Sequence, residues 1–230
     1  MPVLLVASTV HAAAGVGTAM VAMPPLVLAL GLQRAVPLVG VAALFTVLGV
    51  LARDWRAIDL RASAKLLVGS VVGIPCGVLL IRSLPGDLLA RILGVLLVAY
   101  GAFQLWHPRL PRELPGFVVY PFGFVAGVLG GAFNTNGPPV ILYGLVARWS
   151  PQRFRATLSG YFLPTAIAIC ASHALGGLWT SDTVIEFACA LPALAIGNLC
   201  GTWVALHIDR ARFNRLLHAV VLLAGALLIP

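Results

Sequence analysis

Two proline pairs, Pro24-Pro25 and Pro138-Pro139, lie inside long apolar stretches of this chain, and glycines precede each pair. Proline has no backbone N–H and its ring clashes with the preceding helical turn, so we expect neither stretch to form one continuous helix. An interruption is costly in an apolar environment, because the freed backbone groups have no water to bind. A chain that contains this arrangement twice is expected to use it.

The composition places the chain in a lipid bilayer. Of its 230 residues, 60% are hydrophobic and only 10% are charged, whereas about a quarter of the residues in a soluble domain are charged. We therefore expect an all-α integral membrane protein. The N-terminal run lacks the basic segment and the cleavage site of a signal peptide, so we assign it to the fold.

Charge and cysteine usage argue against several classes of function. A net charge of +8 would suggest a nucleic-acid partner for a soluble protein, but here the arginines cluster between apolar stretches, as in cytoplasmic loops. We therefore expect no nucleic-acid partner. The four cysteines lie in apolar runs without the close Cys/His spacing of a zinc site, so we expect small core residues, no metal and no cofactor.

Eight apolar stretches approach or exceed the length needed to cross a bilayer core of about 30 Å. Those at 3–32 and 117–147 are too long for one simple crossing and contain the proline pairs. We interpret these two as re-entrant pairs of half-helices. The other six, three in each half, are predicted to cross the bilayer at 35–52, 62–82, 88–106, 156–175, 183–206 and 213–229.

The two halves of the chain resemble each other. At an offset of 114, three residues fall on identical ones: Gly17, Pro24 and Pro25 on Gly131, Pro138 and Pro139. At an offset of 124 a longer set coincides, including Gly73, Cys76 and Gly77 with Gly197, Cys200 and Gly201. We interpret the chain as one transmembrane domain with repeat one at 1–106, a linker at 107–115 and repeat two at 116–230.

The basic residues predict how the halves are oriented. If all eight stretches cross, Lys and Arg divide almost evenly between the two sides. If the two long stretches are re-entrant, only Arg34, Arg82 and Arg91 lie on one side, and the other twelve of the fifteen lie opposite. Because cytoplasmic loops are rich in Lys and Arg, this favours inverted repeats with both termini outside the cytoplasm, which is the periplasm in a bacterium.

The second interruption suggests an anion site. Asn136 is a candidate N-cap, and the following prolines suit the first turn of a new helix. The free amides and positive dipole end of such a helix favour an anion, and inverted repeats with half-helices of this kind form anionic substrate sites in secondary transporters. The predicted substrate-binding residues are Gly17, Thr18, Pro24, Pro25, Gly131, Asn134, Thr135, Asn136, Gly137, Pro138 and Tyr143.

Four other polar residues in apolar stretches need an interpretation. His11 lies within the first half-helix and is either a proton or anion relay or a structural histidine. Asn198 either lines a cavity or bridges two helices. Glu186 and His173 lie near the ends of their stretches, which favours interface roles over proton relays.

The interrupted stretches resemble a known family of membrane transporters. From Gly127 to Thr157, the run Asn136-Gly137-Pro138-Pro139 followed by Tyr143 and Phe154-Arg155-Ala156-Thr157 resembles the second-repeat signature of the TauE/SafE family, also called the sulfite exporter or toluene-sulfonate uptake permease family. The residues Gly15-Val16-Gly17 and Pro24-Pro25-Leu26 resemble its first-repeat signature. The resemblance implies a bacterial inner-membrane permease for sulfur-containing anions, such as sulfite or organosulfonates.

Three classes of function remain to be compared. We expect a secondary transporter of a small sulfur-containing or carboxylated anion, working by alternating access and driven by a proton gradient, a sodium gradient or the gradient of the substrate. An anion channel built on the same half-helix ends is the first alternative, which the sequence does not distinguish from a carrier. A membrane-embedded enzyme is the second. The seven acidic residues lie mostly in loops and form no catalytic constellation, so we expect no enzyme.

Overall fold

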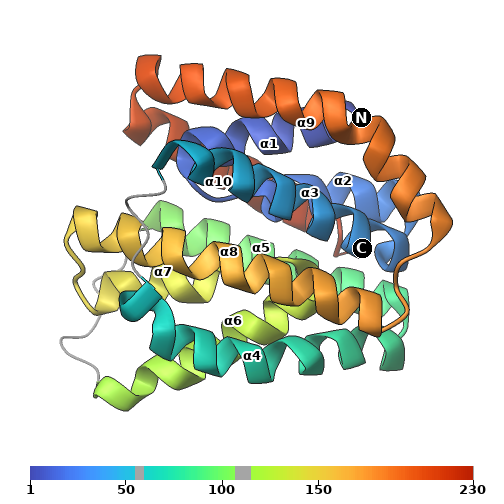
Figure 1. Ribbon diagram of the computed structural model, residues 1–230, viewed down its shortest axis with the longest axis horizontal. Coiled ribbons are helices and arrows are strands. Elements are labelled where there is room, and N and C mark those ends of the chain that lie inside the picture. The colour runs from blue at the N-terminus through green and yellow to red at the C-terminus, as the bar shows by residue number, and fades with distance from the viewer. Residues whose placement is uncertain (55–59, 107–114, 230) are drawn as a thin grey trace.

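The computed structural model describes residues 1–54, 60–106 and 115–229, and within these ranges the chain is helical and contains no strand (Figure 1). The first half contains α1 (Pro2–Ala14), α2 (Thr18–Leu30), α3 (Leu32–Asp54), α4 (Leu60–Ser83) and α5 (Gly86–Trp106). The second half contains the short 3-10 helix η2 (Gly116–Val118), α6 (Val119–Phe133), α7 (Gly137–Val146), α8 (Pro151–Leu175), α9 (Ser181–His207) and α10 (Arg210–Ala226). The predicted linker at 107–115 lies, except for Pro115, outside the described residues.

The all-α membrane architecture is confirmed. Among the described residues, 6 helices are long and apolar enough to cross a bilayer: α3, α4, α5, α8, α9 and the segment Gly116–Phe133, which includes α6. The last of these was predicted as half of a re-entrant pair. In contrast α10, which was predicted to cross, has 17 residues and is not among the six. Its first turns contain the exposed Arg212 and Arg215, which lower its hydropathy.

Both predicted interruptions are present, but proline does not cause the first. Helix α1 ends at Gly15, with φ of 80°, and α2 begins after Gly17, with φ of 124°. Glycine reaches these positive φ values without a Cβ clash. Pro24 and Pro25 lie inside α2, so the prediction that no helix runs through this pair is wrong. The fixed φ of proline is compatible with a helix, so α2 continues through the pair despite two missing backbone donors and the crowding of the rings against the preceding turn.

The second interruption follows the prediction more closely. Asn134 ends α6 in the left-handed conformation, with φ of 55°, and Asn136 is the N-cap of α7. Pro138 and Pro139 occupy the first turn of α7, where their missing donors would be unpaired in any case. Gly131, which the offset of 114 aligned with Gly17, lies inside α6. This offset therefore matches residues in different structural positions.

Each interrupted pair of helices folds back on itself. In the second half, the ring of Tyr143 near the end of α7 lies 5.5 Å from the ring of Phe122 near the start of α6. In the first half, α1 contacts α2, and a Cβ on Gly17 would lie 3.4 Å from Val10. We refer to α1–α2 as the first hairpin and to α6–α7 as the second hairpin.

Glycines in α4 let its backbone come into direct contact with the backbone of the second hairpin. A Cβ on Gly73 would lie 2.2 Å from the carbonyl oxygen of Phe124, and one on Gly77 would lie 2.2 Å from that of Val128. Residue numbers rise together in both helices, so α4 and α6 run parallel. This is the most extensive helix pair in the described structure.

The first hairpin makes the same contact with α9. A Cβ on Gly197 would lie 2.5 Å from the carbonyl oxygen of Leu5, and one on Gly201 would lie 2.2 Å from that of Thr9. These glycines are the residues that the offset of 124 matches with the glycines of α4. Each hairpin therefore packs on a helix of the other half, with α1 beside α9 and α6 near α4 in Figure 1.

The matched helices α5 and α10 also pack against each other. Gly94 contacts Gly225, and Gly101 contacts the carbonyl of His218, so these helices run antiparallel. Opposite directions of matched helices are what an inverted repeat requires. The inverted arrangement of the two halves in a bilayer stays a prediction.

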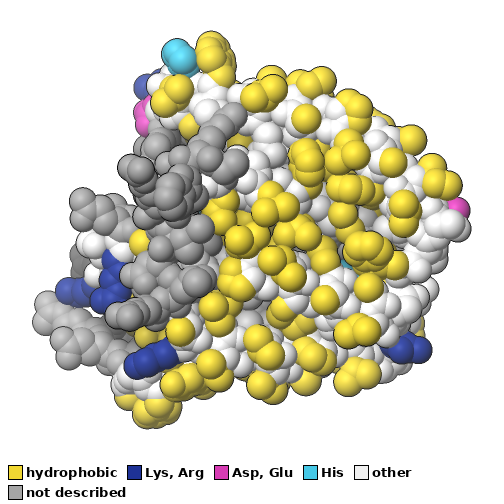
Figure 2. All heavy atoms as spheres, viewed as in Figure 1, with side chains coloured by type: hydrophobic (Ala, Val, Ile, Leu, Met, Phe, Trp, Pro, Cys, Tyr) yellow, Lys and Arg dark blue, Asp and Glu magenta, His cyan; other side chains and the backbone are white. Residues whose placement is uncertain are grey.

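The outer surface is largely apolar, as expected for a protein surrounded by lipid. Figure 2 shows hydrophobic side chains over most of one face. Cys189 and Cys200 are exposed, whereas Cys170 is buried. The prediction that all four cysteines are core residues is therefore wrong, because in a membrane protein an apolar side chain can equally face lipid.

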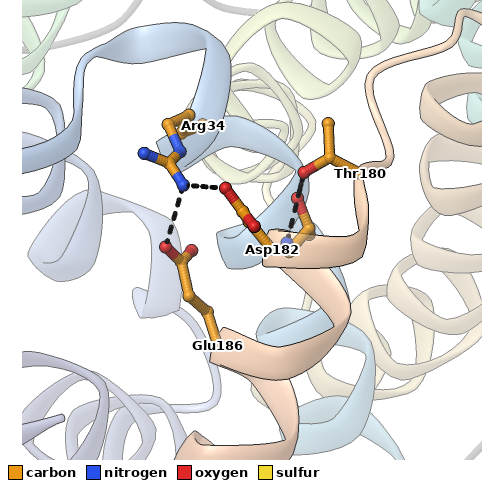
Figure 3. Close-up of polar contacts among 5 residues, drawn as sticks. Arg34, Thr180, Asp182 and Glu186 are labelled. Atoms are coloured by element: carbon orange, nitrogen blue, oxygen red, sulfur yellow. Dashed lines mark hydrogen bonds and ion pairs between the residues drawn. The ribbon is translucent and has the colours of Figure 1, made fainter.

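An ion-pair cluster joins the starts of α3 and α9 (Figure 3). Arg34 pairs with Asp182 and lies 3.7 Å from Glu186. Thr180 caps α9 by accepting a hydrogen bond of 3.3 Å from the N–H of Thr183. The α2–α3 and α8–α9 connections therefore lie at the same end of the molecule.

The packing of α4 against α6 can be tested with a single methyl group. We expect Gly77→Ala to lower the free energy of unfolding by about 1–3 kcal/mol, because the methyl group meets backbone atoms that cannot rotate away. Thermal unfolding of the purified protein in detergent measures this. The matched control is Gly86→Ala, where a Cβ would have no neighbour within 4 Å. Equal midpoints for the two variants would contradict the close approach.

Candidate functional site

A cavity lies where the tips of the two hairpins meet. Its free volume of about 40 Å³ is enough for roughly three water molecules or one small oxyanion. The tips supply most of its polar groups, and the middle parts of α3 and α8 supply its walls. The lining residues are His11, Val16, Gly17, Thr18, Ala19, Met20, Gly40, Ala43, Val47, Asn134, Thr135, Asn136, Gly137, Phe162, Ala166 and Ile169.

The first tip presents the beginning of α2 to this cavity. The backbone N–H groups of Gly17, Thr18, Ala19 and Met20 precede the first helical hydrogen bond, which runs from Val21 to the carbonyl of Gly17. No described residue accepts a hydrogen bond from these four N–H groups. They form the positive end of the α2 dipole and are available to an anion.

The second tip offers fewer backbone donors. Pro138 and Pro139 have no N–H, so only Asn136 and Gly137 contribute free amides at the start of α7. Gly137 faces the first tip closely, since a Cβ there would lie 2.9 Å from Val16. The donors from the two tips therefore converge on one space.

The two asparagines of the second tip hold it in place. The Asn134 side chain donates a hydrogen bond of 2.8 Å to the carbonyl of Val36 in α3. Asn136 has the N-cap position that was predicted, but its side chain does not cap α7. It donates instead to Thr165 of α8, at 3.1 Å.

A histidine bridges the interruption of the first hairpin. His11 is buried near the end of α1, and its Nδ1 lies 2.7 Å from the hydroxyl oxygen of Thr18, the first residue of α2. The edge of its ring packs near Phe162 of α8, with the ring centroids 6.3 Å apart. The imidazole therefore lies in the wall of the cavity, next to the free amides of α2.

Some of the predicted site residues do not line this cavity. Gly131 packs inside the α4–α6 contact, and Tyr143 packs between the rings of Phe122 and Trp149. The prolines of both pairs lie within helices and are not among the lining residues. The predicted set that does line it comprises His11, Gly17, Thr18, Asn134, Thr135, Asn136 and Gly137.

The walls from α3 and α8 were missed by sequence reasoning. Gly40, Ala43 and Val47 recur every three or four residues and so share one face of α3. That spacing of small residues was the available signal. Similar spacing occurs elsewhere in a chain this rich in glycine and alanine, so it does not single out a site.

Two further polar residues are buried among the helices. His173 was predicted at an interface, but it is fully buried, and its Nε2 lies 2.8 Å from the carbonyl oxygen of Gly131. The prediction is wrong because α6 covers this end of α8. Asn198 is buried against Gly49 of α3, where a Cβ would lie 2.5 Å from its amide nitrogen. Its Oδ1 has no hydrogen-bond partner within the described part of the chain. The side chain packs between α3 and α9 and does not line the cavity.

The lining of the cavity is largely apolar, with a few polar groups and no fixed charge. None of its lining residues is Lys, Arg, Asp or Glu, and the one titratable side chain in its lining is His11. Across the described ranges, no group of three or more His, Cys, Asp and Glu residues could hold a metal ion. An anion in this cavity would be held by amide and hydroxyl dipoles.

A comparison with protein families agrees with this geometry. A profile of the sulfite exporter TauE/SafE family matches residues 1–228. The chain belongs to the TauE/SafE family. It is therefore a multi-pass membrane transporter and not an enzyme.

Curated TauE/SafE relatives are named as transporters. The probable inner membrane transporter protein TsaS of Comamonas testosteroni is 29% identical over 176 residues, which cover 76% of this chain and 73% of the relative. The probable sulfite/organosulfonate exporter TauE of Cupriavidus necator is 26% identical over 178 residues, covering 75% and 70%. No solved structure matches this chain significantly.

The role of Asn134 can be divided into backbone and side-chain parts. Asn134→Ala should destabilise the protein by about 2–3 kcal/mol, because alanine tolerates the left-handed conformation poorly and the bond to Val36 is lost. Asn134→Gly should cost about 1 kcal/mol, because glycine tolerates this conformation. Thermal unfolding in detergent measures both. A glycine variant that is less stable than the alanine variant would contradict the left-handed conformation at this position.

Proposed function

We propose that this protein carries a small sulfur-containing anion, sulfite or an organosulfonate, across the bacterial inner membrane. The single observation that supports this best is the convergence of free helix-start amides from both hairpin tips on a cavity that no acidic side chain lines. Backbone donors at a helix N-terminus favour oxyanions. The relatives contribute the chemical class, since one is named for sulfite and organosulfonates and another for the inner membrane.

The size of the cavity favours the smallest members of this class. About 40 Å³ holds roughly three water molecules, so this conformation suits a compact oxyanion better than a bulky one. A bulkier organosulfonate would need a wider cavity in another conformation. We therefore propose sulfite as the first anion to test.

Alternating access is the proposed mechanism. Each hairpin is attached by backbone contact to a helix of the other half, α6 to α4 and α1 to α9. The second hairpin with α4 forms one unit, and the first hairpin with α9 forms the other. Rocking of one unit against the other would move the two tips relative to each other and open the cavity to one side at a time. A proton, a sodium ion or the gradient of the substrate would supply the energy.

Counterflow in proteoliposomes tests carriage against a channel. Vesicles loaded with unlabelled sulfite should accumulate labelled sulfite from outside transiently, because a carrier exchanges one anion for another. We expect this exchange to saturate with sulfite concentration. Non-saturating, voltage-driven current without exchange would contradict alternating access and support a channel.

The proposed topology has inverted repeats at 1–106 and 116–230, with both termini in the periplasm. It places the α8–α9 connection in the periplasm and the α7–α8 connection in the cytoplasm. In a background without native cysteines, we expect Ser181→Cys to react with a membrane-impermeant maleimide in intact cells that have a permeabilised outer membrane. Ser150→Cys should react only after the inner membrane is opened. The reverse pattern would contradict the proposed orientation.

A substitution at the second tip tests the site. Asn136→Leu should weaken sulfite binding about 10–100-fold, because it places an apolar side chain beside the anion and removes the bond that orients the tip. Calorimetry on the purified protein measures the affinity. The matched control is Asn214→Leu, an exposed asparagine of α10, which should bind like the unsubstituted protein. Equal affinity of both variants would argue against this cavity.

A further inference from the structure

The cavity has an unbalanced charge when an anion occupies it. Its lining contains neutral dipoles and apolar side chains, without Lys or Arg. Amide dipoles stabilise an anion, but an ion enclosed in a largely apolar protein is still costly unless an opposite charge accompanies it. The lining offers one group that can supply a positive charge on demand, the imidazole of His11.

The two ring nitrogens of His11 have different surroundings. Nδ1 lies 2.7 Å from the hydroxyl oxygen of Thr18. Nε2 has no hydrogen-bond partner among the described residues. His11 is only 6% exposed, so a donor on Nε2 would find its acceptor in the cavity, where the anion is proposed to bind.

Thr18 can accommodate either charge state of the imidazole. A hydroxyl group both donates and accepts, so it can donate to an unprotonated Nδ1 or accept from a protonated one. In the imidazolium, Nδ1–H donates to Thr18 and Nε2–H is left for the anion. Thr18 also contributes a free backbone N–H at the start of α2. The anion would therefore meet the imidazolium and the α2 amides together.

None of the described residues that line the cavity carries a permanent charge. The contacts of Gly197 and Gly201 put His11 level with about residue 203 of α9, so Glu186 lies roughly 25 Å further along that helix, where it pairs with Arg34 of α3. From α10, the residue that approaches Gly17 is the apolar Leu217.

The neighbouring α8 contributes two titratable groups near the cavity, and each has one hydrogen-bond partner outside it. Tyr161 hydrogen-bonds to Ser70 of α4, and His173 to Gly131 of α6. Neither lines the cavity. Nδ1 of His173 is nevertheless buried without a partner among the described residues, and a Cβ on the cavity residue Gly40 would lie 3.2 Å from it. Helices α2 and α3 contribute no titratable side chain to the lining, and α7 contributes only Gly137.

We propose that His11 takes up one proton when the anion binds, so that proton and anion occupy the cavity together. This rests on the proposed function of the cavity. The proton comes from water on the side to which the cavity is open, binds a ring nitrogen and leaves with the anion, and no covalent bond to the anion forms. Each bound monoanion then enters as a neutral pair, which makes His11 the coupling group of the transporter.

Proton uptake on binding tests this directly. Methanesulfonate and sulfate are the probes, because both keep a constant charge between about pH 5.5 and 8, where histidine titrates. Calorimetry in buffers of different ionisation enthalpy gives the number of protons taken up per anion. For the unsubstituted protein we expect a value near one at neutral pH, and an affinity that weakens up to about tenfold per pH unit as pH rises.

Three variants identify the residue that takes up the proton. His11→Gln keeps a polar group for Thr18, and we expect it to bind with proton uptake near zero and no pH dependence. His173→Gln and the exposed His207→Gln should keep the uptake of the unsubstituted protein. Uptake that persists in His11→Gln, or is lost in His173→Gln alone, would overturn the proposal.

The outcomes separate this inference from the proposed function. Anion binding by the unsubstituted protein without proton uptake would overturn the role of His11 and leave the anion site intact. If neither probe binds at any pH, both the site and the inference fail. If His11→Gln does not fold, the uptake of the unsubstituted protein still decides, because a value near zero excludes a coupling proton.

Discussion

The backbone contact between each hairpin and a helix of the other half is the constraint on which the rest of the structure depends. Gly73 and Gly77 bring α4 against α6, and Gly197 and Gly201 bring α9 against α1, at distances that leave no room for a Cβ. Because each tip is carried by a scaffold that belongs partly to the other half, the cavity lies on the boundary between two interlocked units. A shift between these units must change the cavity.

The same arrangement explains why the cavity needs no lysine or arginine. A permanent cation would hold an anion tightly at every stage, whereas a carrier must also release it. In the proposed mechanism, amides at the start of α2 attract the anion through dipoles that remain when it leaves. The proposed protonation of His11 would add charge only while the anion is present. The Asn134 and Asn136 side chains serve a different purpose, since they anchor the second tip to α3 and α8.

The sequence predicted the membrane architecture, the two interruptions and about half of the cavity. The first interruption was attributed to proline, because proline lacks a backbone donor, but its φ suits a helix. The helix is in fact broken at Gly15 and Gly17, whose positive φ values are not revealed by any sequence pattern. The walls from α3 and α8 were not predictable, because residues such as Ala43 and Ala166 are ordinary in apolar helices and become part of a site only through tertiary packing.

The two offsets at which the chain matches itself differ for a physical reason. The glycines that match at the offset of 124 lie where the backbones of two helices touch. Only glycine fits in these contacts, so both halves have glycine there. The hairpin tips are under no such constraint, and the N-caps Gly17 and Asn136 correspond at an offset of 119, where the residues differ. The first tip has four free amides beside a histidine, and the second has two amides and two anchoring asparagines. The halves thus share a scaffold and diverge at the tips, which is the divergence expected if, as proposed, one tip binds the anion and the other positions the site.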